Sequence, residues 1–480
     1  MIRSRMQLRI IAGALFAAAL LASGFWVWRA TEMRATVVAN LPERPVLEGF
    51  APELGRRLDA AAARGRSVWS ARGGLSELAR LYHANGFLTQ ASACEDTLIE
   101  IEPENPHWTY LRGHIAGGYG DLKTALPLLK KTVQLAPDYL PARVRLGDTL
   151  LKSNEEVEAA SAYREALELV PNNGYAAIGL SRTELNAGNT QAAKKRLLQL
   201  VQRQPTFAPA WGLLISIEER LGNKTAVEEY KLLAKGAGLQ REMPDPWIDD
   251  LMEECYDPYR LSVAASAADP NDNHARARQL LERAVTIAPN DDLPIRLLGN
   301  LMSDLGKLQS ARNYLERAAA IAPEEPDNWS YLVRVLKAIG DMPAANRALD
   351  AGLAKCPEAP VLHLERGRRH AAAGQFDAAA RAFVYARENL PEDSTASMEL
   401  AVVYFKQERL EEGVEELHKV VNTDPNHPVA VILLARYAIS NGNASDAASW
   451  IERARKQPQI APRDLAQVIE EYRARFDRLP

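Results

Sequence analysis

The 480-residue sequence is poor in the residue patterns that carry catalytic and metal chemistry. Its three cysteines, Cys94, Cys255 and Cys356, form no CxxC pair and no CxxCH, which leaves no zinc, thioredoxin-like or haem-attachment spacing. No HExxH, GxSxG or Walker sequence occurs, and the eight histidines are scattered. The formal net charge of -4 lacks the basic excess of a nucleic-acid-binding domain. We therefore expect no cofactor, no metal site, no nucleic acid and no small-molecule substrate.

What the sequence has in abundance is a period of 34 residues. An alanine stands twelve residues before each proline of a regular column, and Gly413 replaces it in the last copy. Seventeen residues before the proline stands a glycine, or Asn154, Asp272 or Glu408. This spacing indicates a helical repeat, in which the glycine ends a first helix, the alanine lies early in a second helix and the proline closes the unit. The prolines are Pro103, Pro137, Pro171, Pro205, Pro289, Pro323, Pro357, Pro391 and Pro425.

With these columns the chain resembles the tetratricopeptide-repeat family over about residues 72–460. The resemblance implies an all-α, right-handed superhelical solenoid of about eleven helix pairs, whose first helices line a concave groove that binds peptides or protein segments. Two weaker copies, around Trp211 and Gly442, complete the array. The resemblance rests most clearly on two copies, Trp329, Leu332, Gly340, Ala345 and Pro357, and Leu146, Gly147, Asn154, Ala159, Tyr163, Ala166 and Pro171.

Residues 1–34 differ from the rest of the chain. Arg3, Arg5 and Arg9 precede an uncharged run from Ile10 to Trp28. A helix over this run would be about 28 Å long, close to the thickness of a bilayer's hydrocarbon core. We expect a signal-anchor with a cytoplasmic amino terminus, which would place the repeats in the periplasm on a bacterial inner membrane. The alternative is a signal peptide cleaved near Ala22–Gly24, with secretion to the periplasm.

The repeats are interrupted once, at residues 235–257. Two Asp-Pro pairs there, at Asp245 and Asp257, predict helix starts, because aspartate caps the first amides and proline suits the first helical position. The resulting short helix is either a structural plug or a docking element made of Trp247, Leu251, Met252 and Tyr256. The predicted order is 1–34 anchor, 35–71 linker and capping helix, 72–234 first repeat block, 235–257 insert, 258–460 second repeat block and 461–480 capping helix.

Arginine is frequent in the column that the resemblance places on the concave surface. Because arginine makes bidentate contacts with carboxylates, a basic groove would favour acidic partner segments. The alternative is that these arginines pair with acids on adjacent repeats. The candidate groove residues are Arg80, Arg182, Arg334, Arg368 and Arg436 in this column, with Arg296 and Lys337 at other groove positions.

The sequence thus predicts a membrane-tethered, non-enzymatic scaffold that binds a protein or peptide partner of unknown identity. One alternative is an accessory factor in the assembly of an envelope complex, such as cytochrome c maturation or polysaccharide export. An enzyme with its site at the insert is the other, although the insert offers only acids, Tyr256 and Cys255 for chemistry.

Overall fold

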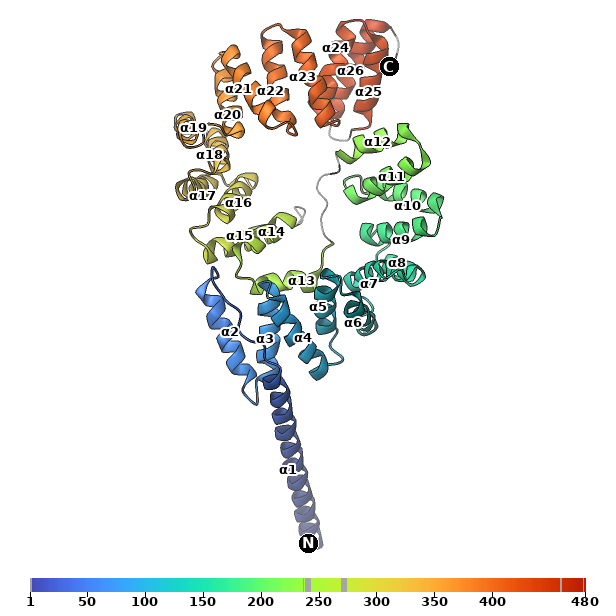
Figure 1. The fold of residues 1–480 in the computed structure, drawn as a ribbon, viewed down its shortest axis with the longest axis vertical. Helices are drawn as coiled ribbons and strands as arrows, with labels where there is room; N and C mark the ends of the chain where they lie inside the picture. The colour runs from blue at the N-terminus through green and yellow to red at the C-terminus, as the bar shows by residue number, and fades with distance from the viewer. Residues whose placement is uncertain (1, 236, 238–242, 269–273, 458–459, 478) are drawn as a thin grey trace. The chain divides into compact units, whose positions relative to one another are not determined.

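The computed structural model describes residues 2–480 except 236, 238–242, 269–273, 458–459 and 478. In the first helix it describes side chains only at residues 20 and 21 and from 23 onward. Every regular element in the described ranges is a helix (Figure 1). The chain forms two compact units, of which the first comprises Met1–Ala193 with Glu242–Pro289 and the second Lys194–Arg241 with Asn290–Pro480.

The first unit begins with two helices that precede the repeats. They are α1 (Ile2–Ala39) and α2 (Pro52–Gly65). The repeat pairs that follow are α3 (Ala71–Ala84) with α4 (Leu88–Ile101), α5 (Pro106–Gly118) with α6 (Leu122–Leu135), α7 (Leu140–Lys152) with α8 (Glu156–Leu169), and α9 (Gly174–Asn186) with α10 (Thr190–Arg203), of which the residues from Lys194 on belong to the second unit. The same unit also holds α13 (Pro246–Asp249), the 3-10 helix η1 (Asp250–Glu254) and a fifth pair, α14 (Pro258–Ala267) with α15 (Ala275–Ile287).

The second unit consists of repeat pairs and one terminal helix. The pairs are α11 (Ala208–Leu221) with α12 (Lys224–Lys235), α16 (Asp292–Asp304) with α17 (Leu308–Ile321), α18 (Pro326–Ile339) with α19 (Met342–Lys355), α20 (Pro360–Ala372) with α21 (Phe376–Asn389), α22 (Ser394–Lys406) with α23 (Leu410–Thr423), and α24 (Pro428–Ser440) with α25 (Ala444–Arg455). The terminal helix is α26 (Pro462–Phe476), which packs on α24 and α25. The described residues thus form eleven helix pairs, and the all-α repeat array expected from the period is confirmed.

The repeating residues explain why each pair folds. Gly340 takes a left-handed backbone with φ 91° between α18 and α19, and Glu408 takes the same region with φ 62° where the column lacks glycine. Ala311 of the alanine column is fully buried, as its place between two helices requires. At Gly413 the missing side chain makes room for the ring of Phe405, since a Cβ there would come 2.5 Å from its Cε1. Asp272 of the turn column lies outside the described residues.

Tryptophans at the start of first helices close the joints between repeats. The indole N–H groups of Trp211 and Trp329 each donate to the carbonyl of the proline six residues earlier, both at 2.8 Å. Trp108 stands one residue nearer to its proline and donates at 2.8 Å to the carboxylate of Glu102 instead. The carbonyl exposed where one repeat ends is thereby satisfied by the next repeat.

One aromatic ring locks three successive helices together. Tyr163 of α8 lies between Gly147 of α7 and Gly179 of α9, and a Cβ at either glycine would overlap its ring. The hydroxyl of Tyr163 donates at 2.6 Å to the carboxylate of Asp148. Only glycine leaves space for the ring on both sides, so these two positions are determined by packing.

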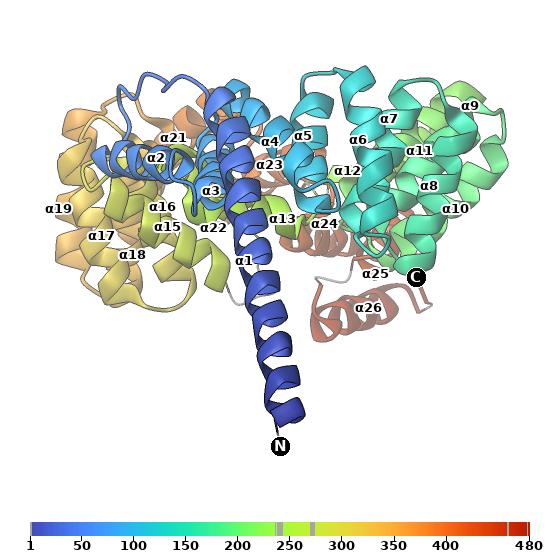
Figure 2. The ribbon, with the colours of Figure 1, turned by 90° about the horizontal axis from the view of Figure 1, so that it is seen from below.

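The first helix does not end where the sequence predicts a linker. Although the linker was expected from residue 35, α1 continues to Ala39 (Figure 2). The reason is tertiary packing, because Val37 is fully buried and the Arg34 guanidinium donates at 2.7 Å to the carbonyl of Arg66. The last turns of α1 therefore dock on α2 and α3.

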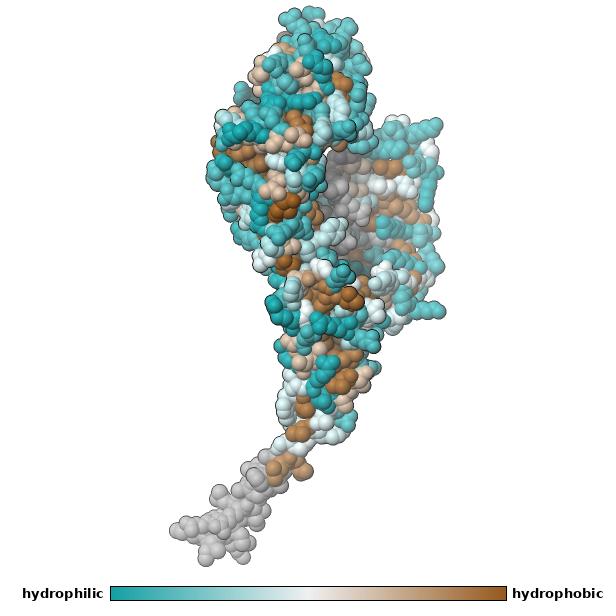
Figure 3. Space-filling model, turned by 60° about the vertical axis from the view of Figure 1, so that its left-hand side comes forward, coloured by the Kyte–Doolittle hydropathy of each residue, from teal (hydrophilic) through white to brown (hydrophobic). Residues whose placement is uncertain are grey.

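The predicted membrane span, residues 10–28, falls mostly on side chains outside the described set. Among the described side chains, no helix combines the length and the apolar character needed to cross a bilayer. The described end of the run is nevertheless apolar at the surface (Figure 3). Its exposed side chains are Leu20, Leu21, Phe25, Trp26, Val27 and Trp28.

Candidate functional site

Residues 246–254 of the insert lie against the first helices of the first repeats. Within the first unit α13 packs on α5, and η1 packs on α3 (Figure 1). The sequence predicts one short helix here, and the structure has a single α-helical turn followed by a 3-10 turn. Side chains from α3, α5 and α7, the first helices of three successive repeats, reach this one segment.

Asp245 anchors the beginning of the segment. Its side chain is buried, and its carboxylate accepts hydrogen bonds from the Tyr110 hydroxyl, from the Tyr139 hydroxyl at 2.6 Å and from Arg145 Nη2 at 3.0 Å. The predicted helix start is confirmed, because α13 begins at Pro246, but the Asp245 side chain makes no capping hydrogen bond. The three partners from α5, the α6–α7 loop and α7 take up the carboxylate instead.

Aromatic rings hold the next residues. The indole of Trp247 stacks on Tyr139 with ring centroids 3.7 Å apart and planes 13° from parallel. Tyr110 and His107 meet the same indole at 5.3 Å and 5.2 Å between centroids. The amide of Trp247 donates at 3.0 Å to the Tyr139 hydroxyl. Tyr139 therefore contacts both the ring and the backbone amide of Trp247.

Burial determines the protonation state of the two tyrosines that contact Asp245. It raises the pKa of Tyr110 far above the ordinary range, an effect that the neighbouring Asp245 carboxylate reinforces against the opposing influence of Arg145. Burial and the hydrogen bond to Asp245 likewise raise the pKa of Tyr139. Both phenols therefore stay protonated at neutral pH and remain hydrogen-bond donors to the carboxylate.

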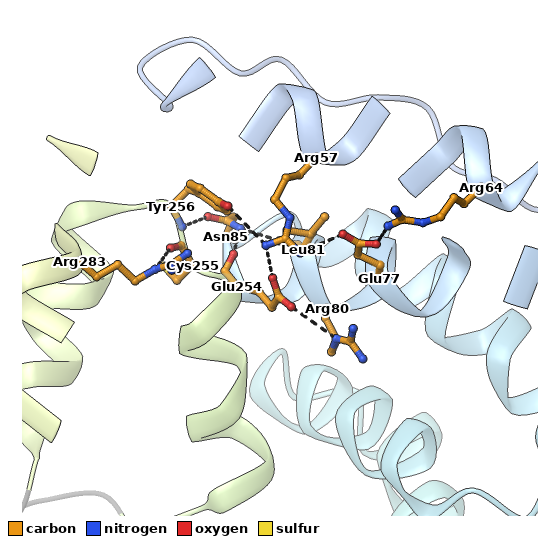
Figure 4. Close-up of polar contacts among 10 residues, drawn as sticks. All are labelled: Arg57, Arg64, Glu77, Arg80, Leu81, Asn85, Glu254, Cys255, Tyr256 and Arg283. Carbon is orange, nitrogen blue, oxygen red and sulfur yellow. Dashed lines mark hydrogen bonds and ion pairs between the residues drawn. The ribbon is translucent and has the colours of Figure 1, made fainter. Parts of the chain in front are cut away.

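The side chain of Asn85 binds backbone groups at the end of the segment (Figure 4). Its Nδ2 donates to the carbonyl of Glu254 at 2.9 Å, and its Oδ1 accepts from the amide of Tyr256 at 2.6 Å. A second Nδ2 hydrogen bond, at 2.8 Å to the carbonyl of Leu81, fixes the side chain on α3. One buried carboxamide thus pairs with the C=O of Glu254 and the N–H of Tyr256, on either side of the extended residue Cys255 that follows η1.

Two arginines meet the carboxylate of Glu254. Arg57 of α2 forms an ion pair with it, and Arg80 Nε of α3 lies 4.0 Å from its Oε1 (Figure 4). Arg57 is itself positioned by Glu77 at 2.9 Å. The Glu254 side chain is only 18% exposed, so its charge needs these cations close by.

The α15 helix holds the segment from its other side. Arg283 Nε donates at 2.9 Å to the carbonyl of Cys255, and its guanidinium lies 5.0 Å from the centre of the Tyr256 ring. Arg276 forms an ion pair with Glu253 and donates at 2.9 Å to the carbonyl of Asp249. The segment therefore connects α14 and α15 to the first repeats.

The predicted docking residues of the insert divide by burial. Leu251 and Tyr256 are buried, whereas Met252 and Trp247 are half-buried. The thiol of Cys255 is fully buried, it donates to the carbonyl of Asp257 at 3.6 Å, and burial raises its pKa. A buried thiol with a raised pKa is a poor nucleophile, which weighs against an enzyme centred on the insert. No cluster suited to hold a metal ion occurs among the described residues.

The predicted groove residues of the first unit have different surroundings. Arg80 faces the insert through Glu254. Arg182 on α9 is exposed and makes no ion pair with the residues that the structure describes. Only Arg80 of these two contacts the segment at residues 245–256.

In the second unit most of the predicted groove cations meet acids of neighbouring helices. Lys337 Nζ and Arg368 Nη1 lie 2.5 Å and 2.6 Å from the buried carboxylate of Glu365. Arg334 differs, because it is exposed, its guanidinium lies 5.5 Å from the centre of the Tyr331 ring, and no acid pairs with it among the described residues. The further pairs are Arg368 with Glu399 at 2.7 Å, Arg296 with Glu325 at 3.2 Å and Asp327 at 3.7 Å, and Arg436 with Glu471 at 3.1 Å.

The sequence did not single out the residues that grip the insert most closely. Tyr110 and Arg145 lie one helical turn before two members of the predicted groove column, Gly113 and Asp148. Reading that neighbouring column would have found both. Asn85 and Tyr139 carry no such periodic signal, since they stand where a repeat turns.

Comparisons with known proteins find tetratricopeptide repeats in two parts of the chain. Two family descriptions, both Tetratricopeptide repeat, match residues 110–174 with 364–428 and residues 150–216. The crystal structure of yeast Tom70 is similar with a TM-score of 0.39 and 14% identity, covering 84% of this chain and 95% of that chain. The APC/C hetero-tetramer Cut9-Hcn1 gives 0.40 and 12% over 82% and 96%, respectively. YrrB, a TPR protein with an unusual peptide-binding site, gives 0.28 and 20% over 36% and 90%. Residues 110–216 and 364–428 therefore match tetratricopeptide repeats.

Proposed function

We propose that the chain is a non-enzymatic scaffold that holds segments of partner proteins on the first helices of its repeats. One observation carries this proposal: three successive repeats grip a single segment, residues 245–256, by a carboxylate, a ring and backbone groups. Grooves that bind peptides use such contacts, namely pockets for side chains, arginines for acidic groups and hydrogen bonds to the main chain. A surface that binds its own segment in this way has the chemistry to bind a foreign one.

The partner segment is acidic. Arg334 projects into solvent beside Tyr331, while the cations around it are already neutralised by Glu365 and Glu399. An arginine without a carboxylate partner can take one from a ligand in a bidentate contact. Of the groove cations predicted for the second unit, Arg334 is thus the one offered to a partner, so the groove is not uniformly basic.

A selection of displayed random peptides tests this function. We expect the native chain to enrich sequences that carry carboxylates, and Arg334→Glu to weaken the selected peptides by about tenfold or more, because a charged hydrogen bond contributes ~1.5–3 kcal/mol. The matched control is Arg347→Glu, since Arg347 is exposed on the second helix of the same repeat. Equal binding by the native chain and both variants would contradict the proposed surface.

We further propose that α1 tethers the scaffold to a bacterial inner membrane with the repeats in the periplasm. The support is the uncharged run at residues 10–28, the arginines on its short side and the exposed Phe25, Trp26 and Trp28 at its end. We expect the protein to stay in the membranes after an alkaline wash. We also expect a protease to reach the repeats only once the outer membrane is permeable. Release by the wash, or a mature terminus near residue 24, would instead support a cleaved signal.

A further inference from the structure

The first-helix face of repeats one to three is already occupied by the chain itself. We propose that residues 245–256 are an internal ligand of this face, and that the partner of the face is an acidic protein segment which competes for the same contacts. This inference rests on the proposed function, since it names the partner class and the regulation of that binding surface. Its observations all come from the first unit.

The contacts of the segment resemble those of a bound peptide more than those of a repeat joint. Joints between repeats are closed by nearest neighbours, such as Trp329 with the carbonyl of Pro323. On the side of α2 and the first repeats the segment is held by residues 100 to 199 positions away along the chain, whereas Arg276 and Arg283 of α15 hold its other side from 23 to 28 positions away. The groove side is supplied by side chains, and the segment contributes backbone groups at both of its ends. Recognition of backbone groups tolerates a change of occupant, because every protein segment carries them.

The two ends of the segment define what a competing partner must carry. The first is a carboxylate followed two residues later by an aromatic ring, as in Asp245 and Trp247, which meet Arg145 and Tyr139. The second is a carboxylate nine residues after the first, as in Glu254. The C=O of that residue and the N–H two residues later must be free to pair with the Asn85 carboxamide. The partner is therefore an acidic segment with an aromatic residue near its start, which takes the same short helical turns as residues 246–254.

The charges on this face favour replacement of the Asp245 carboxylate by a carboxylate of the partner. A face with no carboxylate at this place is less favourable. Arg145 has a side chain 29% exposed, and its carboxylate partner Asp245 is 4% exposed. Vacating the face would leave this guanidinium half-buried beside Tyr110 without its counter-ion, which is unfavourable. An incoming carboxylate restores the pair. Opening therefore depends on a partner that supplies the same group.

A synthetic peptide supplied in trans tests whether the segment is an exchangeable ligand. The probe is a fluorescein-labelled peptide of residues 243–257 with Cys255→Ser, titrated into the full chain and followed by anisotropy. A covalently linked ligand has an effective concentration on the order of 1 mM, so the native chain should bind the probe weakly. We expect a full-length Asp245→Ala, Trp247→Ala, Glu254→Ala variant to bind it at least thirtyfold more tightly.

Two controls separate exchange from loss of structure. Adding Arg145→Met to the triple variant should weaken the probe at least tenfold, and a scrambled probe should not bind. If the triple variant does not keep native helicity and melting, the single change Asp245→Asn replaces it, and tighter binding than the native chain is still expected.

Equal binding of the probe by native and opened chains, or no binding by a folded opened chain, would overturn the inference and leave the segment a structural plug. A native dimer that the probe dissociates would also overturn it, because the occupant would then be a second copy. The test is independent of Arg334, so its failure is distinguishable from failure of the peptide selection.

Discussion

Replacing Gly179 by alanine tests whether the ring of Tyr163 interlocks the repeats. In an ordinary helix interior Gly→Ala stabilises by up to about 1 kcal/mol, because alanine loses less backbone entropy on folding. Here the new Cβ would overlap the ring. The ring cannot retreat to the other side, because a Cβ position at Gly147 is only 2.6 Å from its Cε1.

The expected cost follows from two effects that oppose the propensity gain. Overpacking a filled site costs about 1–3 kcal/mol. A displaced ring also weakens the 2.6 Å hydrogen bond from the Tyr163 hydroxyl to the Asp148 carboxylate, and a bond to a charged group contributes ~1.5–3 kcal/mol. After subtracting the propensity gain, we expect Gly179→Ala to lower the free energy of unfolding by about 2–4 kcal/mol.

Denaturant unfolding followed by circular dichroism measures the loss, and hydrogen exchange localises it to α7–α9. The matched control is Gly212→Ala on α11, where a Cβ meets nothing within 4 Å, so stability should stay the same or rise. In a Tyr163→Leu background Gly179→Ala should cost much less than in the native chain. If Gly179→Ala is as well tolerated as Gly212→Ala, the ring is not wedged and the reasoning fails.

Three further outcomes are expected. Burial lowers the pKa of His114 to about 3, so the unfolded chain takes up the proton first as the pH falls below about 6.5. Stability is therefore lost between those values, and His114→Phe should recover at most about 2 kcal/mol of the loss in unfolding free energy between pH 7 and pH 5. Trp329→Phe removes the hydrogen bond to Pro323 and should cost about 1 kcal/mol in denaturant unfolding, whereas a cost near zero would show that water replaces it. A maleimide should modify the half-buried Cys356 before the buried Cys255 in the native chain, and mass spectrometry showing the reverse order would contradict the burial of Cys255.

The sequence predicts the helix pairs well because each repeat is built from local contacts. The turn at Gly340 and the buried Ala311 follow from columns that recur every 34 residues. The end of α1 could not be predicted in this way. The helix continues past residue 35 because Val37 is buried against helices further along the chain. This contact lies outside the 34-residue repeat, so the period does not predict it.

The candidate site was predicted only in part, for the same physical reason. Asp245 has the local signature of a helix cap, and local reasoning assigned it that role. Its actual partners, Tyr110 and Arg145, lie 135 and 100 residues away. Pairing at such separations depends on how the repeats stack, which a single sequence does not encode in any short pattern.

The long separation between the groove and its segment has a consequence for biosynthesis. Arg145 leaves the ribosome 100 residues before Asp245, and Arg57 leaves 197 residues before Glu254. At about 5–20 residues per second, the first repeats exist for roughly 5–40 s before their own segment is made. During every round of translation the nascent face is open, and a chaperone or partner can reach it before the chain can close it.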